Sequence, residues 1–191
     1  MLRKIFLYTI LTSTLFSQNI WGGNSVATSD NLDAFSLNPA GFGVDRGMQS
    51  GYYIPVNNDG FSLFSATRGQ NFGYLLEKND NDNTKPWYQP NSGKIGFGTK
   101  VGGTNYLGIL WSKNSIEELW TFGTIIRPWN FLSIGATLSN DSNQNNSSNR
   151  IGIALRPFSN HRITVGADYL IRNINNVESK TIHPFANIKL I

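Results

Sequence analysis

The residue types that most often do chemistry in proteins are few in this chain. There is no Cys, and the two histidines are His161 and His183. A serine nucleophile needs a base held beside it, but His161 is followed by Arg-Ile and His183 by Pro-Phe, so neither begins a His-x-Ser pair. No His, Asp and Glu residues have the spacing of metal ligands, and no glycine run has the pattern of a phosphate-binding loop. The sequence therefore predicts a protein that is not an enzyme and has no cofactor or metal.

One short segment has more specific chemistry, and it is the chemistry of a turn. In Asn38-Pro39-Ala40-Gly41, Asn can bond its own backbone, Pro fixes φ and Gly permits a positive φ. The apolar residues Leu37 and Phe42 flank it and need a place to be buried. We therefore expect residues 24–47 to form a plug-like segment that folds back against one end of the domain. The alternative is an exposed tether with no fixed place.

The first 23 residues have the features of a secretory signal peptide. Arg3 and Lys4 precede an apolar stretch over residues 5–16. That stretch is about 12 residues long, shorter than the roughly 20 that a membrane-spanning helix needs. We expect cleavage after residue 17 or after residues 22–23, the alternative being an anchor helix that stays attached. Without these two cations the formal charge of +4 falls to about +2, which gives no reason to expect nucleic acid as a partner.

Residues 48–191 are expected to form an all-β, antiparallel, up-and-down transmembrane β-barrel of about ten strands, or part of a larger barrel. Aromatic residues make up 13% of the chain and charged residues 15%, with 19 glycines, a composition that suits lipid outside and small residues inside. The alternative is a soluble all-β protein. The strand-like stretches cover residues 48–54, 60–67, 71–77, 93–101, 104–112, 118–127, 130–138, 149–156, 161–170 and 181–190.

Within these stretches, large apolar residues alternate with small ones. Ile134, Ile153 and Val165 are expected to face lipid. The opposite face carries glycine repeatedly, which weakens a strand but fits a narrow interior. The glycines predicted to face the lumen are Gly96, Gly98, Gly135, Gly152 and Gly166.

The connections between the stretches alternate in length, as they do between the periplasmic turns and the external loops of outer-membrane barrels. The last long loop is expected over residues 172–180. Two short connections share an Arg-Pro-aromatic sequence, in which Pro favours a turn and the aromatic ring favours a membrane interface. The residues predicted to form periplasmic turns are Arg127, Pro128 and Trp129 in the first and Arg156, Pro157 and Phe158 in the second. Trp111 and Trp120 are expected in an opposite aromatic band.

The Asn38-Pro39-Ala40-Gly41 segment, placed after a leader and before the first strand, resembles the long-chain fatty-acid transporter barrels and the accessory barrels of type IX secretion. The hairpins 127–138 and 156–167 resemble the same group, and most closely the barrel module that precedes signal peptide peptidase domains in some fused chains. Members of the transporter family are about twice as long, and here the last strand ends in Lys-Leu-Ile rather than an aromatic residue. The resemblance therefore assigns no fatty-acid pocket to residues of this chain.

Together these observations predict a non-enzymatic protein of the bacterial outer membrane that passes small hydrophobic molecules or anchors a partner. The alternative is a scaffold module, or truncated N-terminal part, of a signal-peptide-peptidase fusion protein. The expected partners are membrane lipid, the barrel assembly machinery, and a periplasmic peptidase or secretion component.

Overall fold

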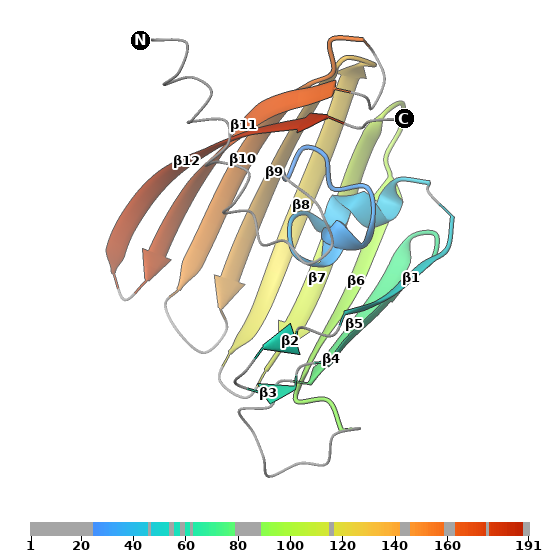
Figure 1. Cartoon of the computed structure of the whole chain (residues 1–191). Coiled ribbons are helices and arrows are strands. Elements are labelled where there is room, and N and C mark those ends of the chain that lie inside the picture. Colours follow the sequence, from blue (N-terminus) through green and yellow to red (C-terminus); the bar gives the residue numbers. More distant parts are fainter. Residues whose placement is uncertain are drawn as a thin grey trace.

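A computed structural model describes residues 25–45, 47–53, 56–57, 60–61, 63–78, 89–114, 117–141, 146–158, 163–174 and 176–188. The predicted signal peptide, His161 and most of the long loop after residue 78 lie outside the described residues. The described part of the chain is an antiparallel sheet whose hollow holds residues 25–45 (Figure 1).

Ten strands form the main sheet, and a small hairpin of β2 (Val56–Asn57) and β3 (Gly60–Phe61) lies in one connection. The strands of the main sheet are β1 (Gln49–Tyr53), β4 (Leu63–Arg68), β5 (Phe72–Lys78), β6 (Ser92–Lys100), β7 (Asn105–Lys113), β8 (Glu118–Trp129), β9 (Leu132–Asp141), β10 (Ser147–Leu155), β11 (Ile163–Ile174) and β12 (Val177–Ile188). Each predicted stretch corresponds to one of these strands. The predicted all-β, antiparallel class is therefore confirmed.

The sheet has up-and-down topology, because its strands pair with their neighbours in the order of the chain, β1-β4-β5-β6-β7-β8-β9-β10-β11-β12. β1 and β12 are its edge strands. The sheet curves strongly, so that one face is concave (Figure 1). One end carries the short connections, such as the turn after Arg68 and that between β8 and β9, and is called the turn end below. The opposite end is called the loop end.

Two sequence predictions about connections are wrong. The polar residues 172–180 do not form a long loop, because β11 continues to Ile174 and β12 begins at Val177, with Asn176 at φ 65° in the tight turn between them. Arg127, Pro128 and Trp129 are not the turn itself. They are the last residues of β8, and the register shift between Ile126 and Trp129 accommodates Pro128, which has no N–H to give to the sheet.

The two faces of the sheet have different side chains, as the period-two pattern predicts. In β10, Gly152 and Ala154 are buried on the concave face, while Ile151, Ile153 and Leu155 are 43–55% exposed on the convex face. The same alternation continues through β9 and β11, where Ser133, Thr137, Thr164 and Asp168 are buried. The glycine face is therefore the concave one.

Residues 25–45 form no strand. They contain two short 3-10 helices, η1 (Leu32–Phe35) and η2 (Pro39–Gly43), and η2 packs against β6, β7 and β8. Pro39 begins η2, where a fixed φ suits the first turn of a helix. None of the helices in the described part of the chain has the length and apolar character needed to cross a bilayer.

Candidate functional site

The candidate site is the concave face, with the buried N-terminal segment of residues 25–44 at the turn end and a cavity at the loop end. Asn38 is the central polar contact of this segment. Its Oδ1 accepts from the Ala40 N–H at 3.0 Å, and its Nδ2 donates to the carbonyl oxygens of Val26 at 2.8 Å and Thr124 at 2.9 Å. Asn38 is fully buried, so these bonds take the place of the hydrogen bonds that its side chain would make to water. One side chain thus joins two parts of the segment to strand β8.

The strand glycines allow the backbone of the segment to lie directly on the sheet. A Cβ at Gly98 would lie 2.6 Å from the Gly43 nitrogen, and a Cβ at Gly96 would collide with the Phe42 ring. Gly135 and Gly152 lie in the same way beneath Val26. These four glycines lie on the concave face, and that this face lines a closed lumen stays a prediction. Gly98 and Gly135 allow close approach of the segment backbone, whereas Gly96 and Gly152 leave room for side chains.

Gly166 shares this face but has different neighbours. A Cβ there would lie 2.7 Å from the Phe185 ring of β12 and would collide with the Ile153 carbonyl. The sequence did not single out Gly73 and Gly108, although both belong to the same set. A Cβ at Gly73 would lie 2.7 Å from the Phe35 and Phe42 rings, and one at Gly108 would collide with the Pro39 carbonyl. The alternation of large and small residues around Gly108 could have identified it.

Gly41 corrects one expectation about the turn motif. Its φ is not positive, unlike those of Gly47, Gly102 and Gly103. It is instead the lack of a side chain that matters, because a Cβ there would collide with the Ser29 carbonyl. The tetrapeptide therefore acts as the start of a packed 3-10 helix.

Apolar packing holds the same segment in place. The Phe35 and Phe42 rings meet edge to face with centroids 4.8 Å apart, and both are almost fully buried together with Leu75 of β5. The Arg68 guanidinium lies 5.9 Å from the Phe42 ring centroid. It also donates to the carbonyl oxygens of Asp30 at 2.6 Å and Val44 at 2.7 Å. Arg68 therefore links two separate positions of the segment, Asp30 and Val44, to the end of β4.

Asp30 is the centre of a buried ion cluster at the turn end. Its Oδ1 pairs with Arg127, and its Oδ2 lies 4.0 Å from the Arg156 guanidinium. The Asp30 side chain is 5% exposed, and the two arginines are 13% and 10% exposed. These are the arginines of the two Arg-Pro-aromatic sequences. Both arginines lie at the turn end, Arg127 within β8 and Arg156 directly after β10, and that this end is periplasmic stays a prediction. Their contact with Asp30 could not be read from the sequence.

A second buried carboxylate fixes the beginning of the segment. Asp168 of β11 accepts from the Ser25 hydroxyl at 2.5 Å and from the Val26 N–H at 3.0 Å. Ser133 of β9 adds a hydrogen bond to the Ala27 carbonyl at 2.5 Å. Residues 25–27 therefore lie across β9, β10 and β11, while η2 covers β6 to β8.

Asp33 is a buried ionisable group of the segment whose pKa is shifted. Burial raises the pKa of its carboxyl to about 7. The hydrogen bond from the Asn31 N–H opposes this shift, and the nearby charge of Asp30 adds to it. Burial disfavours the charged form of a carboxyl. Asp33 is therefore protonated at mildly acidic pH and ionised above neutrality.

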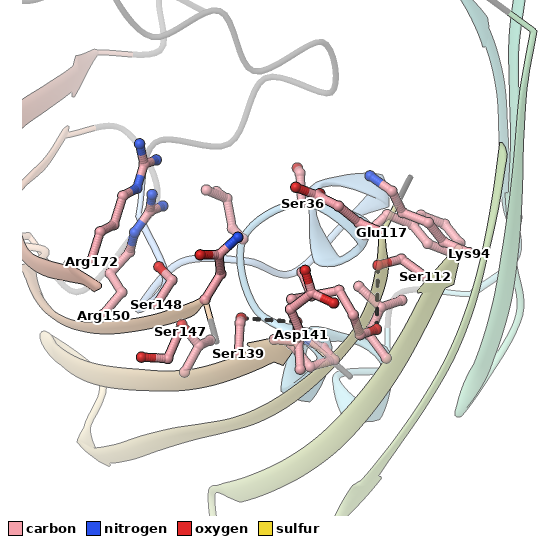
Figure 2. A pocket seen from close by; sticks show the side chains of 18 of the residues that line it. Ser36, Lys94, Ser112, Glu117, Ser139, Asp141, Ser147, Ser148, Arg150 and Arg172 are labelled. Carbon is pink, nitrogen blue, oxygen red and sulfur yellow. Dashed lines mark hydrogen bonds between the residues drawn. The ribbon is translucent and has the colours of Figure 1, made fainter. Parts of the chain in front are cut away.

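The loop end of the concave face holds a cavity of about 520 Å³. Residues of the N-terminal segment, including Phe35, Leu37 and Pro39, form one side of it. The strands supply mainly hydroxyl and charged groups, several of which point into the space shown in Figure 2. The labelled strand residues include Ser112, Ser139, Asp141, Ser147, Ser148, Arg150 and Arg172. The segment thus separates a filled turn end from a polar cavity.

The convex face is largely apolar, with the exposed pair of Glu178 and Lys180 at the loop end of β12 as an exception. Exposed residues on it include Phe72, Phe97, Leu107, Phe122, Leu138, Ile153 and Ile182, which are 40–67% exposed. Trp111 and Trp120 are register partners toward the loop end. Trp129 stacks on Phe131 at the turn end with centroids 5.7 Å apart, and Phe158 is 64% exposed there. These aromatic residues lie at opposite ends of the sheet, and their role as bands at two membrane interfaces stays a prediction.

No group of three or more His, Asp or Glu residues in the described part of the chain is arranged to hold a metal ion. No family model, curated protein or solved structure matches this chain.

Proposed function

We propose that this chain is a non-enzymatic outer-membrane protein whose sheet closes into a transmembrane β-barrel and anchors a partner at the membrane. The observation that carries the proposal is the convex face, where Ile151, Ile153 and Leu155 alternate with buried small residues. A soluble protein rarely exposes so continuous an apolar surface. Lipid is the solvent that suits it, and a barrel is the form in which strands cross a bilayer.

The aromatic residues on the convex face support the same orientation. Trp120 and Trp129 lie nine residues apart in β8. At about 3.3 Å per residue and a tilt of about 40°, this separation spans roughly 23 Å across a membrane. The apolar band of an outer-membrane barrel is about 25 Å tall and is flanked by aromatic residues. We place the turn end in the periplasm and the loop end outside, as the connection lengths of such barrels suggest.

The concave face favours anchoring over passage of small hydrophobic molecules. Asn38, Phe42 and Asp30 are buried in contacts that fill the turn end. The cavity beyond them has hydroxyl and charged groups beside apolar side chains such as Leu110 and Ile174, so a purely hydrophobic solute would leave polar groups of the lining without hydrogen-bond partners. The resemblance to transporter and secretion barrels leads us to propose a periplasmic peptidase or secretion component as the anchored partner.

Cell fractionation tests the proposal directly. The exported protein should be recovered with outer membranes and should migrate differently on a gel before and after heating. Ile153→Arg should destabilise the protein in bilayers by about 2–4 kcal/mol, because it places a charge near mid-membrane. Val177→Arg is the matched control, since Val177 is 69% exposed at the loop end and should tolerate the change.

Recovery in the soluble periplasmic fraction would reject a membrane location. Equal tolerance of Arg at positions 153 and 177 would show that the convex face does not contact lipid. Rapid swelling of liposomes in a small neutral sugar would favour passage over anchoring.

A further inference from the structure

The cavity at the loop end is lined by many hydroxyl side chains, although its place on the concave face does not require them. Hydroxyl side chains from four successive strands line it, among them Ser112, Thr121, Ser139 and Ser148. Its volume of about 520 Å³ is within the range of small-molecule sites. A space of this size on the concave face could have been filled by large apolar side chains, as happens around Phe42. Its lining instead offers hydrogen bonds to a polar molecule.

Two arginines make one side of the cavity positive, whereas Lys94, Glu117 and Asp141 lie among its other lining residues. Arg150 of β10 and Arg172 of β11 are on the same face of neighbouring strands, because Arg150 pairs with Leu170 and Arg172 with Ser148 in the register. Figure 2 shows both guanidinium groups in the same part of the cavity lining. The charge of Arg172 acts on Arg150, and like charges on neighbouring strands repel one another. An anion between them would convert this repulsion into attraction.

The other cations on the concave face differ from this pair. Lys94 lies 3.6 Å from Glu77, and Arg127 pairs with Asp30. Neither Arg150 nor Arg172 forms an ion pair with any described residue. Asp168 is the carboxylate whose charge acts most on Arg150, but it accepts hydrogen bonds from Ser25 and from the Val26 N–H. The two arginines are thus available to a ligand.

We propose that this cavity binds a small hydrophilic solute carrying a phosphate monoester, with the phosphate held between Arg150 and Arg172. A phosphate monoester carries nearly two negative charges at neutral pH, which matches the two arginines. Guanidinium groups bind its oxygens in bidentate geometry. Ser148 is the register partner of Arg172 and shares its face with Arg150, so its hydroxyl group is placed to bind the remaining oxygens or the polar body of the solute. This binding role goes beyond anchoring and does not depend on it.

Calorimetric titration of the full mature chain, folded in detergent, tests this site. The probes are glucose 6-phosphate, glucose, glucuronate and laurate. Glucose 6-phosphate should bind more tightly than glucuronate, which has one charge, while glucose should show no measurable binding. Arg150→Gln and Arg172→Gln should each weaken binding of glucose 6-phosphate at least tenfold. Arg150→Lys should bind it more tightly than Arg150→Gln does, because the positive charge is kept. Lys100→Gln is the charge-matched control, because Lys100 is exposed at the turn end, and it should bind as the unchanged protein does.

Three results would overturn the site. One is unchanged affinity for glucose 6-phosphate in both glutamine variants, with circular dichroism showing that they are folded. Another is equal binding of glucose and glucose 6-phosphate, which would mean that the phosphate is not recognised. The third is binding of laurate alone. None of these results bears on where the protein fractionates, so failure of this site and failure of the membrane location are distinguishable.

Discussion

The two halves of the concave face are built by the same strands but carry opposite side-chain chemistry. Along β8, Gly123 meets the N-terminal segment, while Thr121 faces the cavity two residues away. In β9, Gly135 lies beneath the segment and Thr137 and Ser139 line the cavity. In these two strands glycine lies beneath the N-terminal segment and Thr121, Thr137 and Ser139 line the cavity, while Ser133 is a hydroxyl residue that contacts the segment, at the Ala27 carbonyl.

This difference indicates that the N-terminal segment and the sheet match each other position by position. A flexible tether would need no close contact and would leave no reason for the seven strand glycines beneath the segment, namely Gly73, Gly96, Gly98, Gly108, Gly123, Gly135 and Gly152. Glycine inside a strand weakens the sheet by roughly 0.5–1 kcal/mol relative to alanine. The buried contacts of the segment must therefore stabilise the fold by at least as much as these glycines weaken the sheet.

The largest effect should come from removing the charge that holds the turn end together. Asp30→Asn leaves Arg127 and Arg156 buried without their counter-ion, and breaking a buried pair in this way costs about 3–5 kcal/mol. Denaturant unfolding in detergent, followed by tryptophan fluorescence, measures this loss. Glu178→Gln is the matched control, because its pair with Lys180 is more than half exposed and is screened by solvent, so its loss should change stability little. Equal losses in both variants would mean that Asp30 is not a structural contact.

A glycine pair tests the backbone contact without changing charge. Gly108→Ala should reduce the free energy of unfolding by about 3 kcal/mol, because its Cβ collides with the Pro39 carbonyl. Gly93→Ala in β6 should have little effect or stabilise slightly, since its Cβ would have only ordinary contacts at 3.6 Å. Hydrogen exchange should show faster exchange over residues 25–44 in the first variant only. Unchanged exchange there would indicate that the segment does not depend on close approach.

The strands and the seat of the N-terminal segment could be predicted because their signals are local. Period-two alternation fixes which residues share a face, and Asn38-Pro39 identifies the start of a turn in a few residues. The last loop was predicted wrongly because Glu178, Ser179 and Lys180 resemble loop residues, although they belong to an edge strand whose side chains are exposed.

The contacts that hold the segment could not be predicted in the same way. Asp30 and Arg127 are 97 residues apart, and Ser25 and Asp168 are 143 apart. Nothing in the spacing of such residues pairs them before the fold is known. The repeat of Arg before Pro and an aromatic residue was visible, but an arginine at a turn more often faces solvent than a buried carboxylate.

The smallest effect concerns the pH dependence of the segment. Burial raises the pKa of Asp33 to about 7 from an ordinary value of 3.8, so the folded state holds its proton over a pH range where the unfolded chain has lost it. This contribution to stability is present at acidic pH and is lost as the pH rises toward 7, and it should fall by about 2 kcal/mol between pH 5 and pH 7. Asp33→Asn should abolish that decline, because its amide oxygen can still accept from the Asn31 N–H and it does not ionise. Asp45→Asn, at an exposed position next to the segment, should keep the decline of the unchanged protein. Denaturant unfolding at pH 5, 6, 7 and 8 distinguishes the three proteins, and parallel curves for all of them would show that the Asp33 carboxyl is not buried at the turn end.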